Sequence, residues 1–412
     1  KPFFVYLPTN APHSPYWLPQ SYREAMTRRL AEVEASGAFT KKLAPKKRQE
    51  IIDFLAMIEN IDDNVGRLDA FLKEQGLLDD TVLVFLTDNG STQGADYYNA
   101  GMWGRKTTLW EGGHRVPCFI RYPKGGFGKP RDVHGLAEVQ DLLPTLLDLT
   151  GVAGGQEVDG VSLAPVLRGK AAMDEDRVLV INYSRMPFQF EYAAPDSPSR
   201  MRREGAAVLW KNWRLLEDRE LYDLTTDKLQ RHNVIEEHPE VVARLRAHLD
   251  DWWDSVKELA NEAQPVMIGH PKENPVMLTA CEWLDVFVDQ QQQVRRADRK
   301  NGWWEIEVAQ EGTYEFELRR WPREADLPLD GAMGETKITD GVLPAGVSLP
   351  IARARMQLGA GPMQVKPVQP GDKAANFTQK LAAGRTRLYT WFDDAAQQAL
   401  MGAYYVYVTR KD

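Results

Sequence analysis

The sequence predicts three consecutive parts of different fold class: an α/β part, a small α+β part and an all-β part. Two continuous apolar runs separated by a helical pattern indicate the first part. Short strand patterns within residues 178–224, followed by a helical pattern from Pro239 to Trp253, indicate the second. Alternation of polar and apolar residues in later segments indicates the third, an all-β module of the sandwich type. We place the three parts at residues 1–170, 171–262 and 263–412.

The α/β part is predicted from four features in chain order. Residues 3–7 form a buried strand, followed by a Pro-rich turn. A basic cluster is then interpreted as a solvated helix face: Lys41, Lys42, Lys46, Lys47 and Arg48. Residues 51–72 form an amphipathic helix that Gly76 ends, because apolar residues recur there every three or four positions. Residues 82–86 form a strand covered on both faces, so that strand, helix and strand make a crossover unit of a parallel sheet.

The remaining elements follow the same reasoning. Residues 116–122 form a strand that Pro123 closes, and residues 141–150 form a helix with Asp141 near its N-cap and Gly151 at its end. In the tail, residues 313–319 alternate as a half-buried antiparallel strand does, and residues 303–308 show a similar pattern. Its tryptophans are interpreted as core residues, with a sugar-binding platform as the alternative: Trp283, Trp303, Trp304, Trp321 and Trp391.

Composition excludes several classes of protein. The 412 residues carry a net charge of −8, so the chain as a whole does not attract nucleic acid. No apolar run approaches the roughly 20 residues that span a membrane. The two cysteines, Cys118 and Cys281, are too few for a disulfide framework or a cysteine-based zinc site, although one disulfide remains open.

The first candidate site is Asp88-Asn89-Gly90, which follows the strand at residues 82–86. In open α/β sheets, ligands bind beyond the carboxyl ends of parallel strands. A carboxylate and an amide carbonyl are hard oxygen ligands that suit Ca²⁺ or Mg²⁺, and Gly90 permits the turn that brings them together. Two ligands are too few for calcium alone, and an ordinary Asn-Gly turn is the alternative.

Two further candidates lie in loops at the same edge of the sheet. Prolines hold His13 in a rigid loop, where it can bond an anionic oxygen or transfer a proton. Lys106 offers a compact positive charge for an oxyanion. Gly112 and Gly113 permit close backbone approach, and Glu111 can hold Arg115 or Lys106 by an ion pair. A hard-cation site, a histidine and a lysine together suit an ester of a tetrahedral oxyanion.

With these residues in view, the sequence resembles the sulfatase family of the alkaline-phosphatase-like superfamily. The stretches FFVYLPTNAPHSP, VLVFLTDNG and GRKTTLWEGGHRVP carry the resemblance in the family's order, and DLLPTLLDLTG and ELYDLTTDKLQRHNV add to it. It covers roughly residues 1–260. GWWEIEVAQEGTYEFELRRWP resembles C-terminal modules of some bacterial sulfatases. The resemblance implies an alkaline-phosphatase-like mixed sheet flanked by helices.

The resemblance also implies roles for individual residues. Asp88 and Asn89 would be metal ligands to Ca²⁺, or to Mg²⁺, and Asp88 would also be a proton donor to the leaving oxygen. His13 and Lys106 would bind the sulfate and the bridging oxygen. The substrate would be an aryl or carbohydrate sulfate ester, with a sulfated glycan as one guess. Family members are often exported, which implies a periplasmic or extracellular location.

The sequence departs from the family at the nucleophile. In the family, a formylglycine is made from the first residue of a C/S-x-P-S-R motif, and an N-terminal Asp pair completes the metal site. Neither Cys118 nor Cys281 begins that motif, nor does any serine. We therefore expect the N-terminal part of the catalytic domain to lie upstream of residue 1, and the chain alone to be inactive. Two alternatives stand beside a sulfatase: a phosphoester or phosphonate hydrolase of the same superfamily, and a non-catalytic carbohydrate-binding protein on a degenerate scaffold.

Overall fold

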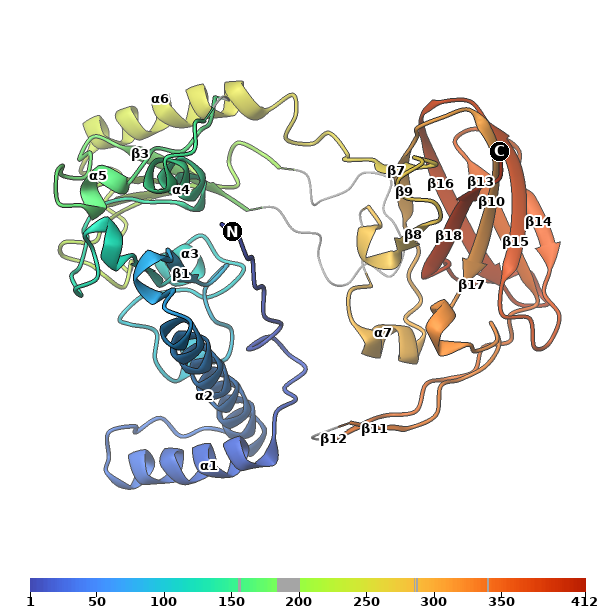
Figure 1. Ribbon diagram of the computed structural model, residues 1–412, viewed down its shortest axis with the longest axis horizontal. Helices are drawn as coiled ribbons and strands as arrows, with labels where there is room; N and C mark the ends of the chain where they lie inside the picture. Colours follow the sequence, from blue (N-terminus) through green and yellow to red (C-terminus); the bar gives the residue numbers. More distant parts are fainter. Residues whose placement is uncertain (155–156, 184–200, 285, 287, 339–340) are drawn as a thin grey trace. The chain divides into compact units, whose positions relative to one another are not determined.

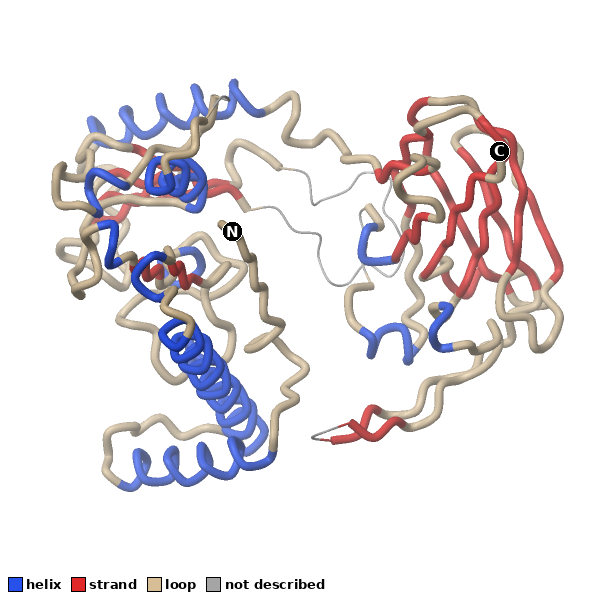
Figure 2. Tube along the Cα trace, in the orientation of Figure 1, coloured by secondary structure: helices blue, strands red, loops and turns tan. Residues whose placement is uncertain are grey.

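The computed structural model describes residues 1–154, 157–183, 201–284, 286, 288–338 and 341–412, which form two compact units (Figure 1). The first unit comprises Lys1–Tyr183 and Met201–Lys257, and the described part of the second is Glu258–Asp412. Helices gather in the first unit and strands in the second (Figure 2). The predicted fold class is therefore confirmed: mixed α/β structure comes first and a β-rich part follows. The boundary placed at residues 170 and 171 stays a prediction.

The first unit contains two small sheets and six helices among its described residues. Its elements are α1 (Gln20–Ala35), α2 (Pro45–Glu74), β1 (Leu83–Leu86), α3 (Glu111–His114), β2 (Cys118–Arg121), α4 (Leu142–Thr150), α5 (Ala164–Leu167), β3 (Val178–Asn182), β4 (Ala206–Trp210), β5 (Trp213–Leu216), β6 (Glu220–Asp223) and α6 (Pro239–Val256).

The amphipathic helix predicted over residues 51–72 is confirmed as part of α2. It begins at Pro45, whose missing N–H costs nothing at a helix start, and Gly76 follows its end at φ +65°. Helix α1 packs against it through Leu30, which contacts Ile51 and Ile52. The sequence analysis assigned no helix to α1. Its apolar residues Tyr22, Met26, Leu30 and Val33 recur every three or four positions, a signal that charged neighbours obscure.

Two predictions about the first sheet are wrong. Residues 3–7 form no strand: their apolar side chains are 57–81% exposed, because no described strand pairs with them and no layer covers them. Strand β1 pairs with β2 in the antiparallel sense rather than the parallel one. Its Phe85 lies opposite Phe119, and both are more than one third exposed, so this strand is not covered on both faces.

The second sheet of this unit is an antiparallel meander, β3-β4-β5-β6, covered on both faces. Helix α6 covers one face (Figure 1), burying Val242 and Leu245 against Val208 and Leu215. The opposite face packs against Leu109 and Trp110, in the loop that leads to α3. The sheet therefore supports a loop in which candidate site residues lie.

The second unit is built from two packed antiparallel sheets. Its elements are β7 (Val266–Ile268), β8 (Val276–Thr279), α7 (Gln291–Arg296), β9 (Trp303–Val308), β10 (Gly312–Arg319), β11 (Thr336–Ile338), β12 (Gly341–Leu343), β13 (Arg353–Leu358), β14 (Gln364–Pro367), β15 (Ala375–Leu381), β16 (Gly384–Asp393), β17 (Ala399–Met401) and β18 (Tyr405–Arg410). One sheet has the order β15-β10-β18-β8, and the other has β14-β13-β16-β9-β7, where only β7 and β9 pair in parallel.

A single hydrophobic core fills the space between these two sheets. Alternate residues point inward along β9 and β10, so that Trp304 and Ile306 meet Phe316 and Leu318 in one cluster. This confirms the alternation predicted for residues 303–308 and 313–319. The cysteines Cys118 and Cys281 are both free and exposed, so they form no disulfide with each other. Among the described residues, no helix combines the length and apolar character that crossing a bilayer requires.

Candidate active site

Three glycines join the loops that carry the candidate residues. The Gly90 N–H donates to the Gly113 carbonyl at 2.9 Å, and a Cβ added at Gly90 would lie 1.8 Å from the Gly112 oxygen. A Cβ added at Gly113 would lie 2.0 Å from the Thr108 oxygen. No side chain larger than hydrogen fits at these contacts. The close backbone approach predicted for Gly112 and Gly113 is therefore confirmed. Gly90 also permits such an approach. Its φ is not positive, so the close contact, and not a turn conformation, requires glycine at this position.

This packing brings Asp88 and Asn89 next to the loop that carries Lys106. The Lys106 N–H donates to the carbonyl of Ser91, two residues after Asn89, at 3.4 Å. Asp88 is exposed, and Asn89 and Lys106 are half-buried. Within the described residues, none of these three side chains forms a hydrogen bond or ion pair. Their polar atoms are therefore available to a ligand.

His13 lies in a loop that packs on α2. Ala11 and Tyr16, on either side of it, contact the cluster formed by Leu18, Ala56 and Met57. The ring is exposed, and its Nδ1 lies 2.6 Å from the Ser14 carbonyl. A carbonyl only accepts, so Nδ1 donates in this contact, which does not involve Nε2. Among the described residues, no hydrogen bond or ion pair joins this side chain to Asp88, Asn89 or Lys106, whereas backbone hydrogen bonds bring together the segments that carry those three.

A buried ion pair fixes the α3 turn against the second sheet. The carboxylate of Glu111, which is 2% exposed, accepts from Arg214 Nε on β5 at 2.6 Å. Its backbone N–H donates to Gln230 Oε1 at 2.9 Å, and Arg115 approaches the other carboxylate oxygen to 3.3 Å. Burial opposes ionisation of Glu111, but the charge and hydrogen bond of Arg214 outweigh it and lower the pKa. The expected pair with Arg115 is confirmed.

The sequence analysis missed Arg214. An arginine within the strand pattern WRLL, where every neighbour is apolar, is the signal that could have found it. His114 is also explained by packing: burial lowers its pKa, and its Nε2 lies 3.1 Å from the Leu109 carbonyl. The ring is therefore neutral and serves the local structure of the loop.

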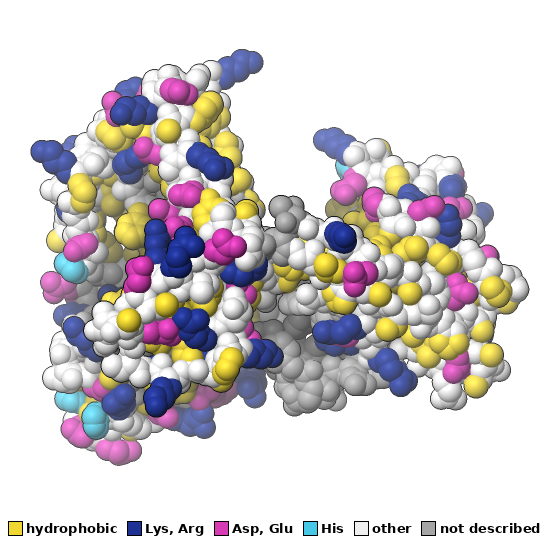
Figure 3. Space-filling view, turned by 90° about the horizontal axis from the view of Figure 1, so that it is seen from below, with side chains coloured by type: hydrophobic (Ala, Val, Ile, Leu, Met, Phe, Trp, Pro, Cys, Tyr) yellow, Lys and Arg dark blue, Asp and Glu magenta, His cyan; other side chains and the backbone are white. Residues whose placement is uncertain are grey.

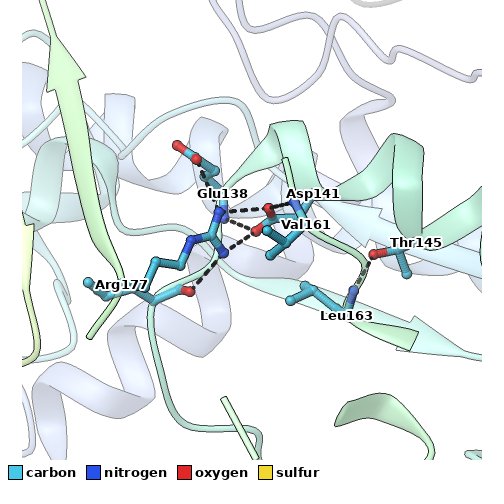
Figure 4. Close-up of polar contacts among 7 residues, drawn as sticks. Glu138, Asp141, Thr145, Val161, Leu163 and Arg177 are labelled. Carbon is cyan, nitrogen blue, oxygen red and sulfur yellow. Dashed lines mark hydrogen bonds and ion pairs between the residues drawn. The ribbon is translucent and has the colours of Figure 1, made fainter. Parts of the chain in front are cut away.

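A second buried network surrounds Asp141 (Figure 4). Asp141, fully buried at the start of α4, accepts two 2.7 Å hydrogen bonds from Arg177 and others from the N–H groups of Glu138 and Val161. Burial opposes its ionisation, but the hydrogen bond from Arg177 and those from the backbone lower its pKa. Asp141 lies at the N-cap position of α4, as predicted, but its side chain makes no capping hydrogen bond to that helix and instead ties the helix start to Arg177, which precedes β3.

The chemistry of Asp88 and Asn89 fits part of a calcium site. Their oxygens are hard donors that follow the end of β1 and bond no side chain within the part of the chain that the structure describes. The part of the chain that the structure describes contains no group of three or more histidine, cysteine and acidic residues able to hold a metal. These two residues would therefore be part of a ligand set and not the whole of it, because calcium takes roughly 6–8 oxygens.

The tail tryptophans divide into two groups. Trp283, Trp304 and Trp321 are at most 5% exposed and belong to the core, as predicted. Trp303 and Trp391 are half-buried on the outer face of the larger sheet, where Arg387 and Arg355 lie over their rings. Each of these two rings therefore has an arginine over one face, an arrangement typical of a cation–π contact.

Comparison with known proteins assigns the class of this fold and site. Residues 1–152 match the profile of the sulfatase family. Residues 100–255 match a profile described as N-sulphoglucosamine sulphohydrolase, C-terminal. The two matches overlap across the loop that contains Lys106, and together they span the first unit. Residues 1–255 are therefore similar to the sulfatase family, and more particularly the α3-to-α6 region is similar to the C-terminal domain of the N-sulphoglucosamine sulphohydrolases.

Individual relatives agree with this assignment. An N-acetylglucosamine-6-O-sulfatase of Bacteroides thetaiotaomicron is 29% identical over 216 residues, covering 51% of this chain and 36% of that protein. A sulfatase of Formosa agariphila is 33% identical over 190 residues, covering 43% and 32%. An arylsulfatase of Clostridium perfringens is 27% identical over 296 residues, covering 66% and 57%. The chain thus spans about one third to just over half of the length of these relatives.

Two solved structures are also similar to part of the chain. One, in complex with its substrate D-glucosamine-2-N,6-O-disulfate, is 25% identical with a TM-score of 0.43, covering 58% of this chain and 48% of that one. A phosphonate monoester hydrolase of Silicibacter pomeroyi is 24% identical with a TM-score of 0.39, covering 56% and 46%.

Proposed function

We propose that the protein is a sulfuric-ester hydrolase acting on an aryl or carbohydrate sulfate. The observation that carries this proposal is the glycine packing that brings Asp88 and Asn89, two residues with oxygen ligands, next to the Lys106 loop. Similarity to the sulfatase family supports the reaction class. The relative named an N-acetylglucosamine-6-O-sulfatase supports a sugar sulfate as the substrate.

The described residues would take complementary parts in this reaction. Lys106 would bind a sulfate oxygen by its positive charge, and His13 would donate or accept at the bridging oxygen through Nε2. Asp88 and Asn89 would hold Ca²⁺, or Mg²⁺, and a proton on the Asp88 carboxyl would pass to the leaving oxygen. The metal, when bound, supplies positive charge beside the transferred group. A formylglycine, the nucleophile implied by the family, would come from a C/S-x-P-S-R motif that residues 1–412 do not contain.

The decisive experiment uses the intact protein with its own upstream coding sequence. Sulfate release is measured by ion chromatography from an aryl sulfate and from N-acetylglucosamine-6-sulfate, with the matching phosphate esters as comparison. We expect sulfate release to dominate and Lys106→Ala to reduce kcat/KM by roughly 10²-fold or more, the size of loss typical for one electrostatic group. Lys129→Ala, an exposed lysine elsewhere in the unit, is the matched control. Preferential phosphate release would contradict the proposal.

Two further proposals follow from the family. Purified residues 1–412 alone should hydrolyse no aryl sulfate, since the sequence contains no nucleophile motif.

The protein should also be exported to the periplasm or the exterior. Fractionation of the native organism, followed by detection with an antibody to the β-rich unit, would test this. Recovery of the protein in the cytoplasmic fraction would contradict export.

A further inference from the structure

Three cations converge on one carboxylate beside the Lys106 loop. Asp96 accepts from Lys47 Nζ at 3.0 Å and from Lys41 Nζ at 3.2 Å, and Arg105 Nη1 lies 3.7 Å away. The sequence analysis interpreted Lys41 and Lys47 as part of a solvated helix face. The structure corrects this: Lys41 precedes α2, Lys47 lies in its first turn, and Arg105 comes from a distant loop. We call Lys41, Lys47, Asp96 and Arg105 the Asp96 cluster.

The Asp96 cluster has more positive than negative charge. Burial opposes ionisation of Asp96, but hydrogen bonds from Lys47 and Lys41 lower its pKa, so it is ionised at neutral pH. Its one negative charge is shared by three cations, and the other nearby carboxylate, Glu50, lies 3.7 Å from Lys47. Elsewhere, acidic and basic side chains are mixed over the face in Figure 3, and the whole chain carries −8. The local excess of cations therefore runs against the chain's overall charge.

The backbone around the Asp96 cluster is held in place while its cations stay accessible. Tyr97, next to Asp96, packs against Phe39 in a tilted arrangement with ring centroids 5.1 Å apart and contacts the core between α1 and α2. The side chains of Lys41 and Arg105 are 54% and 53% exposed, whereas that of Asp96 is 20% exposed. Lys41 and Arg105 are thus much more exposed than the carboxylate, whereas the side chain of Lys47 is 29% exposed.

The position of the Asp96 cluster indicates what it binds. Arg105 immediately precedes Lys106, which the proposed function assigns to the sulfate that is cleaved. An anion at the cluster would then be a neighbouring group of the same substrate. We propose that Lys41, Lys47 and Arg105 form a subsite for a second sulfate group, so that the substrate is a polysulfated glycan. This inference rests on the proposed function for the identity of the first sulfate.

Binding measurements on the intact protein test the subsite. Calorimetric titration would compare a multiply sulfated glucosamine tetrasaccharide with its monosulfated counterpart, in EDTA so that turnover is suppressed. Because an exposed charge contact contributes up to about 1 kcal/mol, we expect neutralising Lys41, Lys47 and Arg105 to glutamine to weaken tetrasaccharide binding by about tenfold or more at low salt. The affinity for the monosulfated sugar should fall by less than about twofold in the same variant, because that sugar lacks the second sulfate.

Two control variants separate the subsite from general charge and from misfolding. Neutralising Lys73, Lys129 and Lys170, three exposed lysines of the same unit, removes equal charge and should leave tetrasaccharide affinity within about twofold. Replacing Lys41 and Lys47 by arginine should keep the affinity. Three outcomes would overturn the subsite. The two triple-glutamine variants could lose equal affinity for the tetrasaccharide, or the cluster variant could lose equal affinity for both sugars. Polyglutamate could also bind as tightly as the tetrasaccharide. Tetrasaccharide binding without sulfate release from any ester would instead contradict the proposed function alone.

Discussion

Single residues decide how closely the site loops approach one another. At Gly90 the hydrogen atom in place of a side chain is what lets the Asp88–Asn89 segment touch the α3 turn, because the Gly112 carbonyl occupies the space of a Cβ. The same chain has glycines without such a contact. Gly66, in the middle of α2, has nothing within 4 Å of its added Cβ. Substitutions at Gly90 and at Gly66 therefore separate the effect of a close contact from the effect of glycine's conformational freedom.

We expect Gly90→Ala to destabilise the first unit by about 1–3 kcal/mol, since an added methyl group must displace backbone. Gly66→Ala should stabilise by about 0.5–1 kcal/mol, because alanine loses less conformational entropy in a helix. Urea unfolding followed by far-UV circular dichroism measures both. Equal behaviour of the two variants would show that the packing at Gly90 relaxes freely.

At the scale of elements, two buried ion pairs join segments that are distant in sequence. Glu111 connects α3 to β5 through Arg214, and Asp141 connects α4 to Arg177 ahead of β3. Neither pair contributes much as a pair, since desolvation offsets most of the attraction. Their effect is positional, because removing one partner leaves the other charged and buried.

Arg214→Met tests the first connection. We expect a loss of about 3–5 kcal/mol in unfolding free energy, because Glu111 is left charged and buried. Arg115→Gln removes the second arginine that pairs with Glu111. The side chain of Arg115 is 67% exposed, so this substitution should cost no more than about 1 kcal/mol of unfolding free energy. Chemical denaturation compares them, and similar costs would mean that solvent reaches Glu111 readily.

The second connection predicts a dependence on pH. The pKa of Asp141 is lowered on folding, so its contribution to stability is present above its ordinary pKa of about 4 and is lost as pH falls through the lower, folded value. The pKa of nearby Glu138 is raised by burial, which acts in the opposite direction. The stability gap between wild type and Asp141→Asn should therefore narrow below about pH 4.

Unfolding free energies at several pH values measure this gap. Asp132→Asn, at an exposed position, should show no comparable change. A gap that stays constant down to about pH 2 would mean that Asp141 titrates alike in both states.

Local patterns account for what the sequence predicted correctly. The spacing of apolar residues by three or four positions predicted α2, and Gly151, which adopts the αL conformation, predicted the end of α4. The alternation of polar and apolar residues predicted β9 and β10. What failed depends on partners distant in sequence. The run at residues 3–7 reads as a strand but has no described strand beside it, and the sense of β1 depends on β2. Arg214 lies 103 residues from Glu111, a separation that no periodicity spans.

The whole molecule has separate hydrophobic cores. The cluster that contains Phe316 lies entirely in the second unit, and the one that contains Leu245 lies entirely in the first. Buried apolar area gives each unit its own driving force for folding. Each unit can therefore unfold as a cooperative whole without the other unit unfolding at the same time.

We therefore expect two calorimetric transitions. Phe316→Ala should cost about 3–5 kcal/mol and lower one of them, while Leu245→Ala should cost about 2–5 kcal/mol and lower the other. Val365→Ala, at a position 50% exposed on β14, should move neither by more than about 0.5 kcal/mol. A single transition that either core substitution lowers would mean that the units unfold together.

The two free cysteines lend themselves to spectroscopy without any engineering. Cys118 lies on β2 of the first unit and Cys281 lies in the second, and both are exposed. Burial of the sulfur atoms raises the pKa of both thiols, so nitroxide labels would attach faster at alkaline than at neutral pH. Pulsed electron spin resonance on the doubly labelled protein would then give the distribution of distances between the units in solution, and its change when a glycan binds.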